Sequence, residues 1–556
     1  MARTVLFTSG SRRRLMMAAG FAVALTGVTG LTAQSAMAAA RTPARLSPLV
    51  VPTDKGAVRG MFSGDAREFL GIPYAAPPVG ALRWRPPAPA APWRGIRDAA
   101  TAGNVCAQIG SIATGVPTTS TAEDCLYLNV YTPRAQNPRG ASRGGRLPVM
   151  VWIHGGGFTG GAGSIYDGAV LAAKGNVMVV TVNYRLGPFG FLALPSLDNE
   201  SPPGSSGDYG LMDQQAALRW VRRNAGAFGG DRHNVTIFGE SAGGASVCDN
   251  MASPTAAGLF GRAIAESGCL LLSSGRQAAE QHGAAFAASL GCTDPATAAA
   301  CLRGKPVSDV LNAGASGGWS PVVGGVTIPE QPATAFASGN YNHVPLIQGT
   351  NHDEGRFFVA LEFDAQGRPL TAAQYPGVIE AQFGAAAAPK ILAEYPLPAY
   401  PSPDLAYASV FTDSVFSCPA LRTDALVWHS GVYAYEFSDP NPPNDFGLTF
   451  TFPLGAAHST ELQYVFQKIP FLDTTPPFTA AQFGLSDQMI GYWSRFAASG
   501  SPNGRVARGP SEGSAPFWPR FTPPGQKIQE LVPDGTAPET GAQFASDHHC
   551  AFWDTL

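Results

Sequence analysis

Charged residues are scarce in this sequence, and the two signs nearly cancel. Of its 556 residues 14% are charged, with 37 lysines and arginines against 40 aspartates and glutamates and a formal net charge of −3. The lack of a basic excess argues against a nucleic-acid partner, and the lack of a strong field argues against a charged substrate. We therefore expect a small-molecule ligand that is neutral at its reacting end. With 45% hydrophobic residues, the composition is that of a folded globular protein.

Cysteine is missing from the first 100 residues, and no Cys-x-x-Cys pair occurs anywhere in the sequence. The eight cysteines that follow are an even number, which in an exported chain predicts disulfides rather than metal ligands or redox chemistry. We expect no metal site. Spacing alone leaves about 105 ways of pairing eight cysteines.

Long apolar runs are confined to the N-terminus. Three arginines at positions 12–14 precede a continuous apolar run, which small residues follow. This is the pattern of an export signal, and the consecutive arginines indicate the twin-arginine route. We expect residues 1–40 to be removed by cleavage near Ala38 or Ala40, and the mature protein to be secreted. No membrane anchor is expected after that, because no later segment reaches the roughly 18 apolar residues of a spanning helix.

No run of like charge, internal repeat or flexible linker divides residues 41–556, which are therefore expected to form a single domain. The 65 glycines and 48 prolines predict many turns and long loops. In enzymes such loops usually wall a pocket above a rigid scaffold. We expect specificity to reside in them.

The sequence contains the pattern Gly-x-Ser-x-Gly four times. In enzymes this pattern places a serine on a tight turn between a strand and a helix, but a glycine-rich chain also produces it by accident. Only residues 239–243 follow a β-branched and aromatic run, at 235–238, and precede small residues that can open a helix. The serines of the other three matches lie in turn-like segments and are Ser142, Ser316 and Ser511. Ser241 is the predicted nucleophile; the alternative is an ordinary helix N-cap.

A glycine-rich loop predicts an oxyanion hole. Residues 149–153 form a buried strand pattern, and His-Gly-Gly-Gly-Phe follows directly at 154–158. Backbone N–H groups of such a loop stabilise the negative oxygen that develops on an ester carbonyl, together with the N–H of Ala242, just after the nucleophile. The alternative is a simple turn after a strand. We interpret His154 as a structural residue of this loop.

In this type of fold the acid and then the base follow the nucleophile along the chain. Glu354 ends a polar turn after a short apolar strand and is the predicted acid. Four histidines follow it and remain candidates for the base: His429, His458, His548 and His549. Order and context favour His458, which stands in a small-residue loop before a helix-like segment.

With these residues identified, the chain resembles the type-B carboxylesterase and lipase family, which includes the cholinesterases and many microbial esterases. The matching segments span almost the whole mature chain and lie at 69–75, 82–84, 123–130, 238–244, 351–355 and 455–462. The resemblance implies an α/β-hydrolase fold. This fold has a large central, mostly parallel twisted sheet flanked by helices, with long loop and helical insertions that form the pocket.

The resemblance also implies roles for individual residues. Ser241, Glu354 and His458 would form the catalytic triad, with Asp353 as a neighbouring surface residue. Oxyanion donors would be the N–H groups of Gly156, Gly157 and Ala242. Glu240 and Ser267 would support the site from behind, and Arg83 and Glu123 would form a buried structural ion pair. Disulfides would join Cys106 to Cys125, Cys292 to Cys301, and Cys418 to Cys550, leaving Cys248 and Cys269 to bridge each other or stay reduced.

These residues predict two-step acyl transfer, in which a carboxylic ester gives an acid and an alcohol through an acyl-enzyme, with no metal or organic cofactor. Cholinesterases carry a tryptophan in the first disulfide loop, but residues 106–125 contain no Trp, Tyr or Phe, so a choline-ester specialist is not expected. The alternatives are a long-chain lipase, an esterase with carbamate or amide activity, and a non-catalytic binding protein of the same family. The sequence does not distinguish the natural substrate or the oligomeric state.

Overall fold

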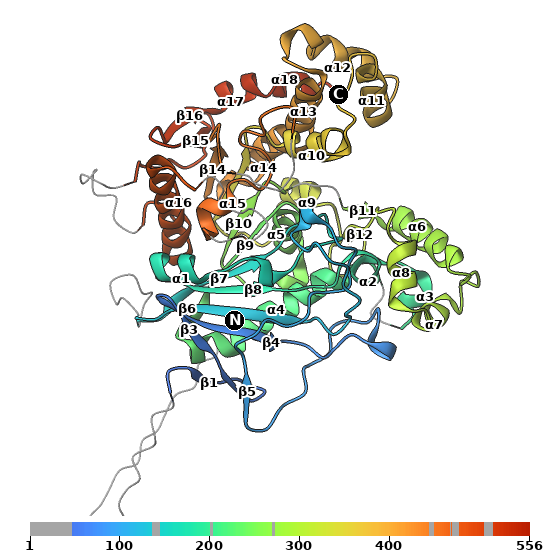
Figure 1. Ribbon diagram of the computed structural model, residues 1–556, viewed down its shortest axis with the longest axis vertical. Coiled ribbons are helices and arrows are strands. Elements are labelled where there is room, and N and C mark those ends of the chain that lie inside the picture. The colour runs from blue at the N-terminus through green and yellow to red at the C-terminus, as the bar shows by residue number, and fades with distance from the viewer. Residues whose placement is uncertain are drawn as a thin grey trace, which may run out of the picture. The chain divides into compact units, whose positions relative to one another are not determined.

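Eleven strands form one sheet at the centre of the structure (Figure 1). Their order across the sheet is β16-β15-β14-β13-β10-β9-β7-β8-β6-β4-β3. The strands from β15 to β8 are parallel to their neighbours, and antiparallel pairs complete both edges. The bounds are β3 Met61–Ser63, β4 Ala66–Pro73, β6 Tyr127–Pro133, β7 Leu147–Ile153, β8 Met178–Val182, β9 Gly230–Glu240, β10 Arg262–Glu266, β13 Leu346–Asn351, β14 Val432–Phe437, β15 Lys527–Leu531 and β16 Ala537–Thr540.

Short strands form two further sheets. The first contains β1 (Val50–Pro52), β2 (Ala57–Arg59) and β5 (Ile96–Asp98). The second pairs β11 (Ser274–Gly275) with β12 (Val322–Val323).

The computed structural model describes residues 47–135, 145–200, 204–269, 273–443, 450–467, 469, 477–504 and 515–556. The expected export signal at 1–40 lies outside these ranges, and so do Ser142 and Ser511. Leu46–Leu556 group into one compact unit. Within the described ranges, none of the helices is long and apolar enough to cross a membrane.

The described α-helices lie between the strands and after the last of them. Their bounds are α1 Ala169–Gly175, α2 Gly187–Phe191, α3 Pro195–Asp198, α4 Tyr209–Phe228, α5 Ala242–Ala252, α6 Arg276–Ser289, α7 Ala298–Arg303, α8 Val307–Ala313, α9 Pro332–Ser338, α10 Gly355–Glu362, α11 Tyr375–Phe383, α12 Ala388–Glu394, α13 Pro403–Phe411, α14 Cys418–Val427, α15 Leu462–Phe466, α16 Ala480–Ser499, α17 Gly541–Asp547 and α18 Cys550–Trp553. A π-helical turn, Thr412–Ser417, joins α13 to α14.

The central strands are buried on both faces. Val149, Val151 and Ile153 of β7 belong to one hydrophobic core, whereas Met150 and Trp152 belong to another. Successive side chains of a strand point to opposite faces, so the sheet separates the two cores. Buried residues of α4 and α5 complete the first core, and those of α1 and α16 complete the second. Helices therefore cover both faces of a mostly parallel sheet, as the resemblance implies.

Two groups of helices lie in long insertions between strands of the sheet. Helices α6 to α9 lie between β10 and β13 in the sequence, and α10 to α14 lie between β13 and β14. In Figure 1 the yellow and orange helices α10 to α13 gather at one end of the structure, and the green helices α6 to α8 gather at another. These are the helical insertions that the resemblance implies.

Four disulfides are present. They join Cys106 to Cys125, Cys248 to Cys269, Cys292 to Cys301, and Cys418 to Cys550. The first, third and fourth are the pairs that the resemblance implies. The second joins the two cysteines whose state the sequence left open.

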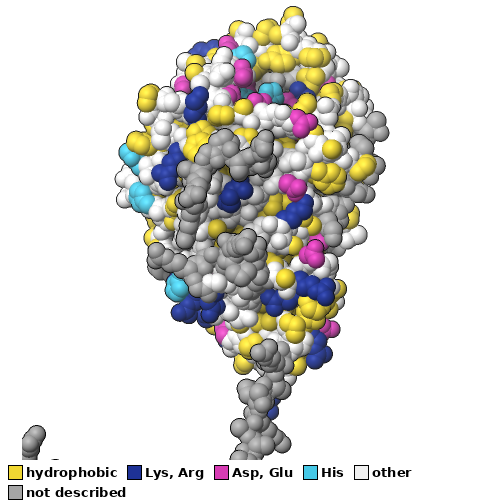
Figure 2. Space-filling model, turned by 90° about the vertical axis from the view of Figure 1, so that its left-hand side faces the viewer, with side chains coloured by type: hydrophobic (Ala, Val, Ile, Leu, Met, Phe, Trp, Pro, Cys, Tyr) yellow, Lys and Arg dark blue, Asp and Glu magenta, His cyan; other side chains and the backbone are white. Residues whose placement is uncertain are grey.

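On the face that Figure 2 shows, Lys and Arg side chains lie in small groups among apolar and acidic side chains, rather than in one continuous basic surface.

Candidate active site

The candidate site lies at the carboxyl-terminal ends of the central strands of the sheet. Strands β7, β9 and β13 are parallel, so the segments that follow them leave the sheet at the same edge. The glycine loop follows β7, Ser241 follows β9, and Glu354 follows β13. The region just beyond the carboxyl ends of parallel strands is where α/β proteins bind their ligands.

Ser241 occupies a strained turn between β9 and α5. Its backbone has φ 56° and ψ −124°, in the half of conformational space that residues with a side chain rarely adopt. The N–H of Ser241 donates to the carbonyl oxygen of Glu266 at 2.9 Å, which fixes the turn. Gly243 permits close packing beneath it, because a Cβ there would lie 2.0 Å from the carbonyl oxygen of Ile153.

The hydroxyl of Ser241 is not used to cap the helix. Ser241 stands at the N-cap position of α5, yet its side chain makes no cap hydrogen bond. This argues against the interpretation of Ser241 as an ordinary N-cap. Ser316, from a competing Gly-x-Ser-x-Gly match, lies exposed in the turn after α8.

The glycine loop after β7 packs against the nucleophile turn. A Cβ at Gly155 would lie 3.1 Å from the Cβ of Ser241. Gly156 has φ 102°, and a Cβ there would lie 2.3 Å from the carbonyl oxygen of Gly160. In the described part of the chain, the N–H groups of Gly156, Gly157 and Ala242 donate to no protein acceptor. They are the three predicted oxyanion donors, and free N–H groups beside a nucleophile are what that role requires.

His154 is a buried structural residue of this loop. Its Nδ1 lies 2.8 Å from the carbonyl oxygen of Gly155, and its ring stacks on that of Tyr184 with centroids 4.4 Å apart. Burial lowers the pKa of His154 to about 4, and the hydrogen bond to Gly155 opposes this only in part. The imidazole is therefore neutral near pH 7.

Of the four candidate bases, His458 is the one that contacts Glu354. Its Nδ1 lies 2.5 Å from Oε2 of Glu354, and both side chains are buried. The N–H of Asn351 donates to the other carboxylate oxygen, Oε1, at 2.9 Å. Glu354 is thus held in place by Asn351, and its bond to Nδ1 of His458 fixes the orientation of the imidazole.

The other three histidines have different surroundings. His429 is exposed, and His549 lies 2.7 Å from Glu394. His548 is buried between Asp413 at 2.7 Å and Glu436 at 2.6 Å. Burial alone would lower its pKa, but these two carboxylates raise it to about 10, so His548 is charged at neutral pH and cannot accept a proton.

The second ring nitrogen of His458 faces Glu240. Its Nε2 lies 3.0 Å from Oε1 of Glu240, but the geometry is not that of a hydrogen bond. Within the described residues Nε2 has no hydrogen-bond partner, and no hydrogen bond joins His458 to Ser241. Such bonds are often long in the absence of substrate and tighten when it binds.

Opposing effects set the proton affinity of this pair. Burial lowers the pKa of His458, but the charges of Glu240 and Glu354 and the bond to Glu354 outweigh burial, so the pKa is raised. Burial raises the pKa of Glu240, although His458 and a hydrogen bond from Ser459 act against it.

Asp353, the neighbour of the predicted acid, points elsewhere. Its carboxylate pairs with Arg356 at 2.9 Å and with His352 at 3.0 Å, and accepts the N–H of Ala456 at 3.0 Å. These partners lower the pKa of Asp353 despite its burial. It braces the loop that precedes His458.

Two buried acids at the site were not predicted from the sequence. Glu266 ends β10, accepts the indole N–H of Trp493 at 2.9 Å, and has its pKa raised to about 8 by burial. Glu461 accepts the amide of Asn351 at 2.5 Å, and burial together with the nearby carboxylates raises its pKa. Of these two acids, only Glu461 could have been associated with the site from the sequence, because it lies three residues after His458.

Ser267, predicted to support the site, lies directly after Glu266. It has φ 49°, its N–H donates to the carbonyl oxygen of Gly349 at 2.9 Å, and its buried hydroxyl has no hydrogen-bond partner in the described structure.

Aromatic rings surround the imidazole of His458. The centroid of Phe358 lies 4.8 Å away and that of Phe416, from the π-helical turn, 5.0 Å away. Phe358 is half-buried, so this cluster gives the site an apolar wall. The sequence carried no signal for it, because the two phenylalanines come from separate helices.

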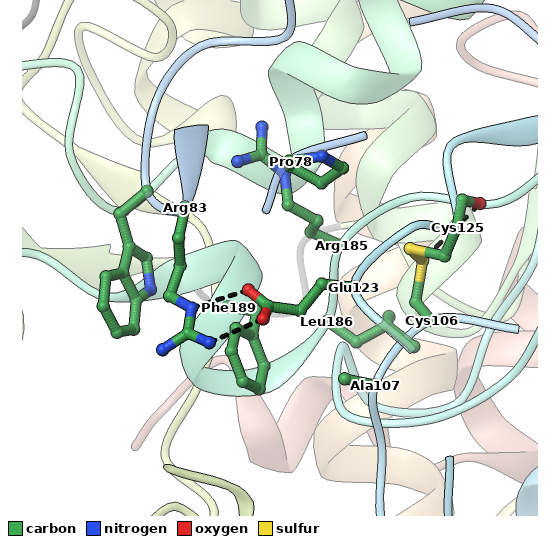
Figure 3. A pocket seen from close by; sticks show the side chains of 10 residues that line it. Pro78, Arg83, Cys106, Ala107, Glu123, Cys125, Arg185, Leu186 and Phe189 are labelled. Carbon is green, nitrogen blue, oxygen red and sulfur yellow. Dashed lines mark hydrogen bonds and ion pairs between the residues drawn. A yellow bond between two sulfur atoms is a disulfide. The ribbon is translucent and has the colours of Figure 1, made fainter. Parts of the chain in front are cut away.

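Arg83 and Glu123 form the ion pair that the resemblance implies, at a distance from the triad. Two guanidinium nitrogens of Arg83 each lie 2.6 Å from an oxygen of Glu123, as Figure 3 shows. The pair lines a small cavity of about 10 Å³ together with Trp84, Phe189 and the Cys106–Cys125 disulfide, and no triad residue lines it. We attribute a structural role to this cavity.

The first disulfide loop is also tied to the glycine loop. The side-chain amide of Gln108 donates to the carbonyl oxygen of Gly161 at 2.9 Å, and the N–H of Gly161 donates back at 2.8 Å. The ion pair and disulfide that hold residues 106–125 therefore also support the loop beside Ser241. Nowhere in the described ranges do three or more His, Cys, Asp or Glu side chains group so as to hold a metal ion.

Comparison with known proteins points to one family. The model of the carboxylesterase family matches residues 47–553. Fumonisin B1 esterase of Sphingopyxis macrogoltabida is 35% identical, with 91% of this chain and 90% of that protein covered. Para-nitrobenzyl esterase of Bacillus subtilis (strain 168) is 36% identical, covering 83% and 92%. Cocaine esterase of Homo sapiens is 34% identical, covering 89% and 88%.

Solved structures agree. A thermophilic PNB esterase superposes with a TM-score of 0.75 at 33% identity, and the match covers 90% of this chain and all of that one. A second PNB esterase structure gives a TM-score of 0.74 at the same identity.

Proposed function

Because this chain belongs to the carboxylesterase family, is a carboxylic ester hydrolase and has the α/β-hydrolase fold, we propose that it cleaves neutral esters through a covalent acyl-enzyme on Ser241. The observation that carries this proposal is the buried bond of 2.5 Å between His458 and Glu354, with Nε2 of His458 turned towards Glu240, the residue directly before Ser241, and not used in a hydrogen bond.

In the first step the Ser241 hydroxyl attacks the ester carbonyl carbon while Nε2 of His458 accepts its proton. The carbonyl oxygen becomes negative and accepts hydrogen bonds from the N–H groups of Gly156, Gly157 and Ala242. Glu354 stabilises the imidazolium and keeps its Nδ1 proton in place.

The tetrahedral intermediate then breaks. Nε2 of His458 returns the proton to the departing alkoxide, which leaves as an alcohol, and the acyl group remains on Ser241. Water enters, gives its proton to Nε2 and attacks the acyl carbon. Collapse of the second intermediate releases the carboxylic acid and restores the Ser241 hydroxyl.

The acyl-chain preference separates an esterase from a lipase. The relatives named above carry the names of three different ester substrates, so family membership does not define this one. We propose short-chain esters, because the rings of Phe358 and Phe416 pack against the imidazole of His458. Hydrolysis of p-nitrophenyl esters from acetate to palmitate tests this. Highest activity at short chains supports the proposal, and an optimum at long chains indicates a lipase.

We propose in addition that the protein is secreted after removal of residues 1–40. The four disulfides support this, because such bonds persist in oxidising compartments. Expression of the full chain followed by N-terminal sequencing of the protein in the medium tests it. Export should fail when the arginines at 12–14 are replaced by lysine, if the route is the twin-arginine one.

A further inference from the structure

Ser459, directly after the base, adopts a conformation that favours glycine. Its φ is 70°, in the left-handed region that costs a residue with a side chain free energy. Ser459 is half-buried. Backbone strain of this kind at a candidate active site indicates that the side chain has a function there.

The hydroxyl of Ser459 binds the carboxylate that faces the base. Its Oγ donates to Oε1 of Glu240 at 2.6 Å. The same oxygen lies 3.0 Å from Nε2 of His458, out of line for a hydrogen bond. One carboxylate oxygen therefore has two neighbouring groups that can donate to it, and it is bonded to Ser459.

We propose that Ser459 is a positioning residue, whose hydroxyl holds the Glu240 carboxylate so that it does not capture Nε2 of His458. This inference rests on the proposed function, in which Nε2 exchanges a proton with Ser241. If Nε2 bonded to Glu240 instead, the buried ion pair would compete with Ser241 for the nitrogen that catalysis needs.

His458 is the group beside Glu240 that can carry a positive charge, which is why the two can pair. The other titratable groups facing Glu240 and His458 come from six segments and are Tyr166, Tyr184, Glu266, Glu354, Tyr435 and Glu461. None of them is a cation, so His458 is the positive partner available to Glu240 at this site. The Ser459 hydroxyl donates a hydrogen bond to the Glu240 carboxylate without adding a charge.

Removal of this donor changes proton binding in a definite direction. With one proton on the Glu240–His458 pair, the proton itself stabilises the carboxylate. Without that proton, the carboxylate depends more on Ser459. Loss of the hydroxyl therefore destabilises the deprotonated, active form more than the protonated form, and the pair retains its proton to higher pH.

The experiment compares the pH dependence of kcat/KM for the wild type, Ser459→Gly and Ser459→Ala on one p-nitrophenyl ester. Glycine fits the backbone and alanine does not, so the two variants differ in stability but share the missing hydroxyl. We expect the acid limb of both profiles to move to higher pH by about 0.5 to 1 pH unit. This shift is smaller than the one that the full free energy of a hydrogen bond to a charged group would cause.

Asp534→Gly is the matched control. Asp534 is exposed and has φ 57°, so glycine removes the same kind of backbone strain away from the site. The acid limb of the pH profile of Asp534→Gly should match that of the wild type. An unchanged limb in Ser459→Gly, or a shift to lower pH, overturns the inference. Absence of ester hydrolysis by the wild type would instead overturn the proposed function, so the two failures are distinguishable.

Discussion

Replacing Glu354 with glutamine preserves the shape of the predicted acid but cannot preserve both of its hydrogen bonds. One carboxylate oxygen accepts the N–H of Asn351 at 2.9 Å, and the other faces Nδ1 of His458 at 2.5 Å. A glutamine has one oxygen and one NH2 group for these two places. If its oxygen serves Asn351, the NH2 faces Nδ1 and forces the His458 proton onto Nε2, where it blocks the acceptance of a proton from Ser241. If the groups are exchanged, the NH2 opposes the N–H of Asn351 in a fully buried site.

The magnitude follows from this tautomer argument. The wrong tautomer of a triad histidine costs on the order of 10³ to 10⁴ in kcat, or about 4 to 5.5 kcal/mol of transition-state stabilisation. Loss of the Glu354 charge also removes one of the effects that raise the pKa of His458. The residual activity should therefore persist to lower pH than that of the wild type.

Steady-state kinetics with a p-nitrophenyl ester measures both effects, with the melting temperature as a check on folding. Asp353→Asn is the control, because Asp353 is the adjacent carboxylate but pairs with Arg356 and His352. We expect it to keep kcat within a few fold of the wild type. The reasoning is refuted if Glu354→Gln keeps more than about a tenth of the wild-type kcat, or if the control loses more than Glu354→Gln does.

Three further substitutions test other parts of the account. Gly156→Ala should lower kcat by about 10² to 10³ at little cost in KM, because the added Cβ meets the carbonyl of Gly160 and shifts an oxyanion donor; unchanged kinetics would contradict the assignment. Glu266→Gln should melt at a progressively higher temperature than the wild type as the pH rises from about 4 to 8. Because burial raises the pKa of Glu266 to about 8, its carboxyl stays protonated in the folded state over this range while it ionises in the unfolded state, so the wild type loses stability as the pH rises; a pH-independent difference would count against that. Arg83→Met should lower the free energy of unfolding by about 3 to 5 kcal/mol in denaturant titrations, because Glu123 is left buried without its partner; a loss below about 1 kcal/mol would show that water replaces the arginine.

Local patterns predicted the nucleophile turn and the glycine loop, because both are short segments whose backbone the sequence determines. Ser241 follows a β-branched strand and precedes a helix of small residues, and the structure has β9 and α5 at those positions. At Gly155 and Gly156, two of the three glycines after 149–153, a Cβ would collide with the carbonyl oxygens of Glu240 and Gly160. Chain order favoured His458 over three other histidines, and its contact with Glu354 now separates it from them.

Contacts between segments that are distant in the sequence could not be predicted from it. Phe416 reaches His458 from a π-helical turn, and Glu266 lies behind Ser241 because β10 pairs with β9. Cys248 and Cys269 are joined because α5 packs on β10, which no spacing rule indicates. The bond from Ser459 to Glu240 depends on the relative position of a loop residue and the last residue of β9, which are 219 residues apart in the sequence.

Covalent labelling tests the central claim most directly. A fluorophosphonate probe should modify the wild type at a single site, and mass spectrometry of the digested protein should place the label on the peptide that contains Ser241. Ser241→Ala should remain unlabelled and lose about 10⁶ in kcat on p-nitrophenyl acetate, whereas Ser316→Ala should behave as the wild type. Ester hydrolysis that survives in Ser241→Ala, or a label on another serine, would contradict the account.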